Sequence, residues 1–184
     1  MKSTRFSARQ MVFTAVMAAL ICIAAPFVIP LPSAVPLSVA TFAVYMAGAL
    51  LGKEKGTLAV LIYLLIGLVG LPVFSGFTGG IARLAAPTGG YLVGYISCAF
   101  LTGLFADKFG GKLWSMAAGM VLGTLSLYLF GTIWFVISTG ADVWSALLAC
   151  VVPFLPLDGV KIAAACAVSV PLRKKLLFLN TRSE

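Results

Sequence analysis

Long apolar runs, separated by short polar or Gly/Pro-rich segments, make up most of this 184-residue chain. About 20 helical residues, at 1.5 Å each, cross the roughly 30 Å hydrocarbon core of a bilayer. The pattern predicts an all-α integral membrane protein that forms a single transmembrane domain over residues 1–184. We expect six transmembrane helices, at about residues 12–29, 37–51, 57–71, 91–105, 113–138 and 158–172.

The segments between the apolar runs predict several kinds of connection. A proline-rich stretch at residues 26–36 ends the first helix, because proline cannot continue the hydrogen bonding of a helix interior. The polar residues 53–55 predict a tight hairpin between two short helices. Residues 72–88 are rich in Gly and Pro and predict a structured loop. Residues 143–152 are apolar but only about half long enough to span, which predicts a re-entrant or interfacial helix.

Composition excludes a soluble protein. Hydrophobic residues make up 61% of the chain and charged residues 10%, with a mean hydropathy of +1.11, whereas soluble domains are roughly half apolar and one quarter charged. The formal charge of +8 could suggest nucleic acid as a partner. The basic residues are scattered over short loops, however, and lack the clustered face that a phosphate backbone needs, so no nucleic acid is expected.

The chain contains no histidine, and its cysteines stand singly in apolar runs, so we expect no metal site, cofactor or disulfide framework. Catalytic sets are also missing from the sequence. It has no nucleophile triad, no HExxH, no Walker-type glycine loop followed by Lys and no paired carboxylates on one helix. We therefore expect that the chain is not an enzyme and does not use ATP by itself.

The distribution of basic residues predicts the orientation, because Lys and Arg accumulate in cytoplasmic loops. Three precede the first apolar run, two lie at residues 53–55, two at 108–112 and four after the last run, which is 11 of the 13 in the chain. With six spans, both termini are predicted to be cytoplasmic. The first run resembles a signal peptide because basic residues precede it. It is long enough to span a membrane, however, so we expect it to be retained.

Asp158 and Lys161 are conspicuous because they are charged and lie near the start of the last apolar run. A charge at the centre of a membrane helix costs about 2.5 to 3.5 kcal/mol on insertion scales, so such residues usually face an internal cavity. Their spacing of three puts them on one helical face, where they can neutralise each other. They are either a structural ion pair or a donor and an acceptor presented to a ligand, and spacing alone does not decide.

Arg83 stands alone in the Gly-rich outer loop without an acidic neighbour in sequence. It could extend toward the membrane interface, or it could bind a ligand carboxylate. The surrounding loop offers hydroxyl groups, and glycines that let backbone approach a ligand closely. These further candidate contacts are Ser75, Thr78, Thr88, Tyr91, Gly79 and Gly80.

Small residues one turn apart let membrane helices approach closely. The glycine pairs at positions 48/52 and 119/123 are expected to pack within the molecule. Ala15 and Ala19 lie near the cytoplasmic end of the first predicted helix. They could pack in the same way or could dock a partner protein, and their spacing does not choose between these two.

The outer segments carry a specific family resemblance. Residues Gly70–Gly80 read GLPVFSGFTGG, Ala86–Tyr95 read APTGGYLVGY and Pro156–Lys161 read PLDGVK, and residues 35–52 fit as well. Over almost its whole length the chain resembles the BioY family, the biotin-binding S components of energy-coupling factor (ECF) vitamin importers. The resemblance implies the six-helix S-component fold, an outer ligand cavity and high-affinity capture of biotin at a bacterial-type cell membrane.

The resemblance also implies partners. These are a transmembrane coupling subunit and two ATPase subunits, together with the surrounding lipid bilayer. In the family an alanine pair in the first helix docks the partner subunit, and Ala15 and Ala19 match that pair.

Biotin would give each charged candidate a role. Asp158 would accept hydrogen bonds from the ureido N–H groups, Lys161 would donate to the ureido carbonyl and Arg83 would bind the carboxylate. Alternatively, Lys161 binds the carboxylate and Arg83 only reaches the interface. The rings of biotin would lie against aromatic side chains: Tyr91 and either Phe74 or Phe77.

The chain departs from the family pattern at four positions. It has Ala40 where Gln is frequent, Thr78 where some members have an amide, Ala86 where Gly is common and Leu92 where others have Arg. Arg83 is a candidate to replace that guanidinium from the same loop. Two other functions stay open, an S component for another vitamin and a membrane assembly subunit without a ligand.

Overall fold

The computed structural model describes residues 7–29 and 37–181, and this part of the chain is built almost wholly from helices. Two-residue strands, β1 (Val28–Ile29) and β2 (Leu37–Ser38), pair antiparallel between the first two helices. The predicted all-α class is confirmed apart from this short ladder. The helices are α1 (Ala8–Ala24), α2 (Ala40–Leu68), α3 (Ala82–Ala85), α4 (Gly89–Lys108), α5 (Leu113–Thr139), α6 (Val143–Cys150) and α7 (Leu155–Thr181).

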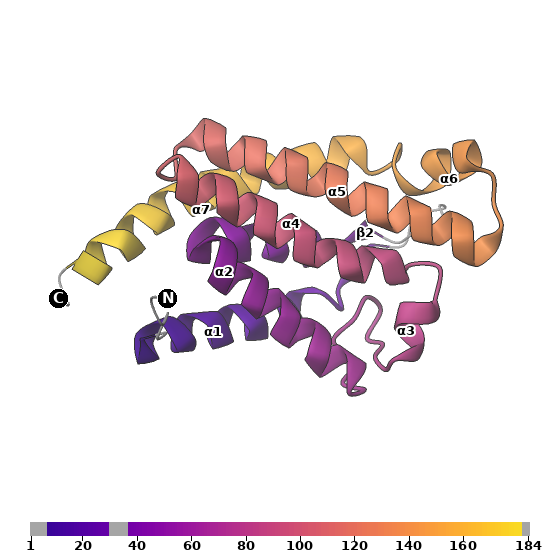
Figure 1. The fold of residues 1–184 in the computed structure, drawn as a ribbon, viewed down its shortest axis with the longest axis horizontal. Coiled ribbons are helices and arrows are strands. Elements are labelled where there is room, and N and C mark those ends of the chain that lie inside the picture. The colour runs from indigo at the N-terminus through magenta and orange to yellow at the C-terminus, as the bar shows by residue number, and fades with distance from the viewer. Residues whose placement is uncertain (1–6, 30–36, 182–184) are drawn as a thin grey trace, which may run out of the picture.

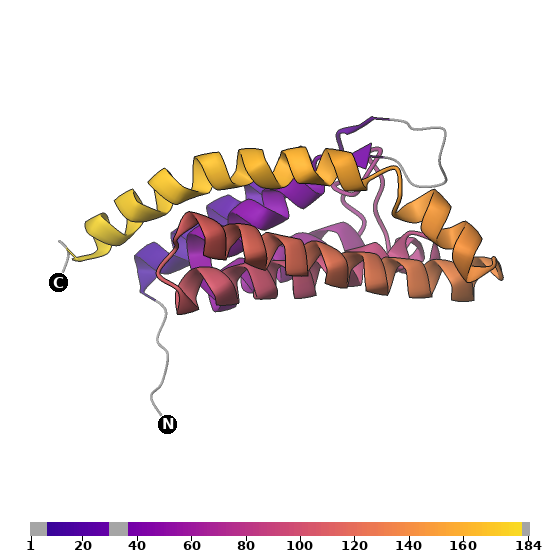
Figure 2. The same cartoon turned by 90° about the horizontal axis from the view of Figure 1, so that it is seen from above.

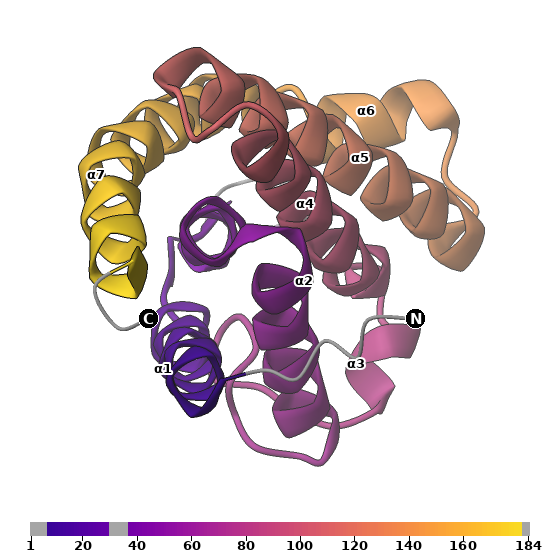
Figure 3. The ribbon, with the colours of Figure 1, turned by 60° about the vertical axis from the view of Figure 1, so that its left-hand side comes forward.

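The helices are arranged as an elongated bundle. α4 and α5 run side by side along its long axis, and α7 lies along another side (Figure 1, Figure 2). α2 occupies the middle, in contact with α1, α4 and α7 (Figure 3). The described chain ends and the α4–α5 turn lie at one end of the bundle, whereas α3, α6 and the strands lie at the other (Figure 1).

α2 reverses direction at Gly52, whose backbone is non-helical with φ 81° and ψ −179°. A Cβ atom at Gly56 would lie 2.6 Å from the carbonyl oxygen of Ala47, although nine residues of unbroken helix would separate these positions by about 13 Å. The two halves of α2 therefore pack against each other, which confirms the predicted helical hairpin. The break is a single glycine in a left-handed conformation rather than the polar segment that follows it.

One carboxylate joins three helices at this end of the bundle. Asp107 Oδ2 accepts from the backbone N–H of Lys53 at 2.9 Å, immediately after the break in α2. Asp107 Oδ1 accepts from Arg173 Nη2 at 2.6 Å, and Arg173 Nη1 donates to the carbonyl oxygen of Ala49. Arg173 is only 8% exposed, so these partners offset the cost of burying its charge.

Glycines allow the close packing of α4 with its neighbours, as predicted for small residues in membrane helices. A Cβ atom at Gly119 would lie 3.1 Å from the Cα of Thr102, and one at Gly123 would lie 3.0 Å from the carbonyl oxygen of Cys98. Gly48 on α2 approaches Ala99 in the same way. The predicted intramolecular role of these glycines is confirmed.

Some predicted boundaries are wrong. α1 ends at Ala24 rather than near residue 29, because the apolar run continues into a turn and β1. The last helix begins before residue 158 and continues past residue 172. The proline-rich turn at residues 30–36 lies outside the described residues.

Length and apolar composition make three of the described helices capable of crossing a membrane: α4, α5 and residues 155–176 of α7. α1 is apolar but shorter, with 17 residues. Large apolar side chains on the outer face of α5 are exposed, among them Val121, Leu125 and Leu129. A surface of this kind suits lipid as the surrounding solvent, and the chain is a membrane protein.

Candidate functional site

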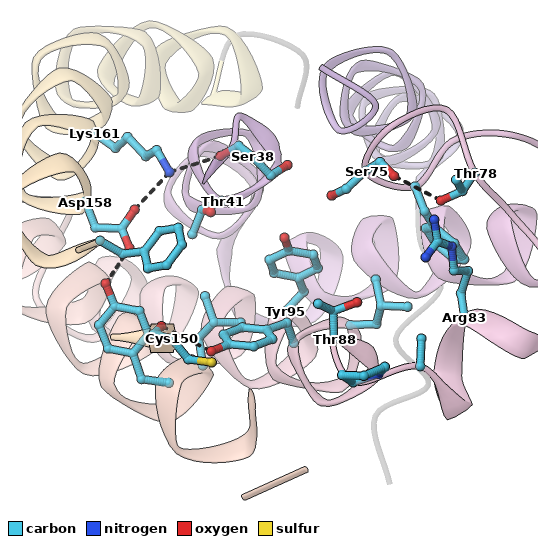
Figure 4. A pocket seen from close by; sticks show the side chains of 18 residues that line it. Ser38, Thr41, Ser75, Thr78, Arg83, Thr88, Tyr95, Cys150, Asp158 and Lys161 are labelled. Carbon is cyan, nitrogen blue, oxygen red and sulfur yellow. Dashed lines mark hydrogen bonds and ion pairs between the residues drawn. The ribbon is translucent and has the colours of Figure 1, made fainter. Parts of the chain in front are cut away.

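A cavity of about 340 Å³ lies where β2, the 70–88 loop and α4 to α7 meet. This volume falls at the lower end of the roughly 300–1,000 Å³ typical of small-molecule sites. Segments far apart in sequence supply its walls (Figure 4). The lining residues are Ser38, Thr41, Phe74, Ser75, Thr78, Arg83, Ala86, Pro87, Thr88, Tyr91, Leu92, Tyr95, Leu127, Tyr128, Cys150, Phe154, Asp158 and Lys161.

Asp158 and Lys161 lie on the first turns of α7 and form the predicted ion pair. Lys161 Nζ donates to Asp158 Oδ1 at 2.9 Å and to the backbone carbonyl oxygen of Ser38 at 3.0 Å. Their side chains are 16% and 7% exposed, respectively, so the pair is largely removed from solvent. One donor and one acceptor thus stand together in the cavity wall, held by β2 as well as by α7 (Figure 4).

The neighbouring helix contributes a second donor to the same carboxylate. The hydroxyl group of Tyr128, on α5, donates to Asp158 Oδ2 at 2.6 Å. Because an ionised carboxylate can only accept, the tyrosine must be the donor. Each carboxylate oxygen therefore already has one hydrogen bond from the protein.

Arg83 lies on α3, on the opposite side of the cavity from Asp158 and Lys161 (Figure 4). Its side chain is half-buried and lines the cavity. Within the described residues its guanidinium makes no hydrogen bond or ion pair. Nearby, the Thr78 hydroxyl donates to the Ser75 carbonyl oxygen at 2.9 Å. The two sides of the cavity thus differ, with a neutral pair on one side and an unpaired cation on the other.

Two aromatic candidates are held firmly in the cavity wall. Phe74 is 2% exposed and packs edge-on against Tyr63, with ring centroids 5.6 Å apart. Tyr91 donates its hydroxyl to the Cys150 carbonyl oxygen of α6 at 3.2 Å, and its ring occupies the space above Gly131. In α6, burial raises the pKa of the Cys150 thiol, so this part of the wall is uncharged at neutral pH.

Three of the candidate residues are not among those that line the cavity, namely Phe77, Gly79 and Gly80. Phe77 is 61% exposed and packs against Phe27, with centroids 5.5 Å apart. Gly80 has a φ of 95° and donates its N–H to the Gly67 carbonyl oxygen at 2.7 Å. These residues shape the loop that presents Phe74, Ser75, Thr78 and Arg83.

Ala15 and Ala19 do not line this cavity. Both are exposed on α1, whose other face packs into the bundle through Thr14, Met17, Ala18 and Ile21. For metals, the described residues hold no group of three His, Cys, Asp or Glu side chains that could bind one ion.

Sequence reasoning missed several lining residues, including Ser38, Thr41, Tyr95, Tyr128 and Phe154. All are uncharged. Ser38 contributes its backbone oxygen, and a backbone contact cannot be predicted from the type of residue. The one available signal was a polar hydroxyl in the middle of an apolar helix, as at Tyr128, since such groups need a partner away from water.

Comparison with known proteins identifies the family. The BioY family model matches residues 1–178. The chain belongs to the BioY family. Its relatives are transporters, in agreement with the expectation that it is not an enzyme. The biotin transporter BioY of Thermotoga maritima is 40% identical over 167 residues, covering 90% of this chain and 96% of that protein. A probable biotin transporter BioY of Pyrococcus horikoshii is 37% identical and covers 76% and 81% of the two chains.

A solved structure agrees with this membership. The S component for biotin from an ECF-type ABC transporter superposes with a TM-score of 0.84 at 28% identity, covering 95% of each chain. This BioY chain therefore has the S-component fold.

Proposed function

We propose that this chain is the high-affinity biotin-binding S component of an ECF-type vitamin importer. Its BioY relatives are named biotin transporters, and the similar solved structure is an S component for biotin. The observation that carries the proposal is the cavity itself, which has a neutral donor–acceptor pair on one side and, on the other, Arg83, which has no ion-pair partner in the part of the chain that the structure describes.

Biotin matches this arrangement part by part. Its ureido ring has two N–H donors for Asp158 and a carbonyl acceptor for Lys161. Its thiophane ring is apolar and would lie against Phe74 and Tyr91, which line the cavity where Phe77 does not. The carboxylate of its valerate tail would bind Arg83, for which a guanidinium is well suited.

In this proposal the chain forms one membrane domain with six spans, namely α1, the two halves of α2, α4, α5 and α7. Both termini and the α4–α5 turn face the cytoplasm of a bacterial-type cell, and the cavity opens toward the exterior. Transport requires a transmembrane coupling subunit and two ATPase subunits, because the sequence contains no nucleotide-binding loop of its own.

Binding by the purified protein tests the proposal. We expect saturable binding of biotin, but not of thiamine or riboflavin, and biotin among the small molecules that copurify, as detected by mass spectrometry. Asp158→Asn and Lys161→Met should each weaken binding roughly tenfold to a hundredfold, because hydrogen bonds to charged groups contribute about 1.5 to 3 kcal/mol.

Asp142→Asn is the matched control. Asp142 is exposed and caps α6 by accepting from the backbone N–H groups of Trp144 and Ser145, which an asparagine can also do. It should leave biotin affinity unchanged. Preferential binding of another vitamin would replace biotin in the proposal, and the absence of any saturable ligand would favour an assembly subunit.

A further inference from the structure

Tyr128 is the one side chain outside α7 that donates to Asp158 within the described residues. The hydroxyl–carboxylate distance is 2.6 Å, and the two residues are 6% and 5% exposed. A hydrogen bond to an ionised acceptor in such surroundings is stronger than one between neutral groups, and its geometry is well defined. The contact joins α5 to α7 at the cavity wall.

The Tyr128 ring is itself held in place. It packs with Phe154, and Tyr91 and Val151 lie against the same cluster. Its hydroxyl is therefore a fixed donor, in contrast to Lys161, which reaches Asp158 from one turn along the same helix through a long side chain. With Lys161 as its only partner, the Asp158 carboxylate would be held from α7 alone and could still rotate about its side-chain bonds.

Two donors from different helices fix the plane of the Asp158 carboxylate. Oδ2 accepts from Tyr128 and Oδ1 accepts from Lys161. An ionised carboxylate has about four lone-pair positions, so about two remain for a ligand. With its charge stabilised from both sides, the group offers acceptors only, and a ligand must meet it with N–H or O–H donors.

We infer that Tyr128 is a positioning residue for ligand recognition, which holds the Asp158 carboxylate in one orientation so that the cavity selects a head group with paired N–H donors, such as a cyclic urea. This inference rests on the proposed function and adds a residue that acts through Asp158. It gives the buried Tyr128 hydroxyl of α5 a function as well as a partner.

Tyr128→Phe keeps the ring and removes only the hydroxyl. We expect it to weaken binding of biotin and of the uncharged biotin amide by the same factor, roughly tenfold, because Tyr128 acts at the head-group side of the cavity. Tyr45→Phe is the matched control. It removes a buried hydroxyl that bonds Thr124, and Tyr45 does not line the cavity, so biotin affinity should stay at the wild-type value.

A double-mutant cycle separates positioning from packing. In the Asp158→Asn background, Tyr128→Phe should cost less than roughly threefold in biotin affinity, since residues that act through one another are not additive. A full additional loss in that background would overturn the inference, as would an equal loss from Tyr45→Phe. Wild-type affinity in Tyr128→Phe would overturn the inference and leave the proposed function standing. Failure of the wild-type chain to bind biotin would overturn both.

Discussion

The ammonium group of Lys161 lies where β2, α7 and the cavity meet. It donates to Asp158 and to the Ser38 carbonyl oxygen, so two of its three N–H groups have protein partners and one is available to a ligand. A ureido ring could bind this remaining N–H and the remaining lone pairs of Asp158 while the ion pair is kept and the site stays net neutral. Neutrality matters here because a buried charge without a partner costs several kcal/mol.

Arg83 is the residue expected to recognise the acidic tail of the ligand. Arg83→Gln should weaken biotin binding roughly tenfold to a hundredfold, through loss of a charge-assisted hydrogen bond of about 1.5 to 3 kcal/mol. Biotin amide has no carboxylate to lose, so it should bind the variant and the wild type equally. Calorimetric titration of both ligands into purified protein measures the difference.

Lys161→Met provides the comparison for Arg83→Gln, because it too removes one cation from the cavity wall. It should weaken both ligands by similar factors, since the ureido ring is common to them. Equal losses for both ligands at Arg83, or a loss confined to biotin at Lys161, would contradict these roles and give the carboxylate to Lys161.

At the scale of single residues, the sequence identified the charged part of the cavity and little of the rest. Asp158, Lys161 and Arg83 are conspicuous because charges are expensive in an apolar chain. Tyr128 could not be paired with Asp158 from sequence, because they lie 30 positions apart and the chain between them includes a turn, α6 and a second turn whose geometry decides the distance. Sequence also could not choose Phe74 over Phe77, since the choice depends on how the loop folds.

Helices were predictable wherever apolar length alone defines them. α4 and α5 match the predicted runs to within a few residues, because polar loops end them abruptly. Hydropathy measures burial in lipid rather than helical backbone, so it overran the end of α1 and stopped short of the basic last turns of α7. The ladder of β1 and β2 was not predicted, because two residues are too few for a strand pattern.

α1 presents two different faces along its length. One packs into the bundle, and the other exposes Ala15 and Ala19 among larger apolar side chains. Small residues let a second helix approach closely, so this face is suited to the coupling subunit of the proposed complex. Lipid tails could also cover this face. A bulky side chain would keep a partner helix away, whereas lipid tails would adapt to it.

Replacing both Ala15 and Ala19 by Trp should therefore prevent recovery of the complex while leaving biotin binding by the isolated chain unchanged. Copurification with the coupling and ATPase subunits and titration with biotin measure the two properties separately. Leu125→Trp is the control, because Leu125 is 54% exposed on α5 and likewise accepts a larger side chain at the apolar surface. An intact complex with the double variant would contradict docking through this face.

The charged residues of the whole molecule form two groups, one at each end of the bundle. The turns near Gly52 and residues 108–112 and the described end of α7 lie together, and Asp107 links them by its bonds to Lys53 and Arg173. α3 and α6, which each contribute a lining residue to the cavity, lie at the opposite end (Figure 1). This separation agrees with the basic-residue count made from sequence, because loops that are adjacent in space belong to the same side of a membrane.

Thiol labelling of intact cells tests the orientation that follows from this separation. A cysteine at Thr78 is close to threonine in size and needs no change of backbone, unlike one at the glycines of the same loop. Thr78→Cys should react with an impermeant maleimide from outside, and saturating biotin should protect it because Thr78 lines the cavity. Lys108→Cys, exposed at the other end of the bundle, should react only after the membrane is opened.

The native cysteines are buried or half-buried, so the unsubstituted protein supplies the background. Labelling of Lys108→Cys in intact cells, with Thr78→Cys unreactive, would reverse the topology and place the cavity on the cytoplasmic side, where it could not capture an external vitamin.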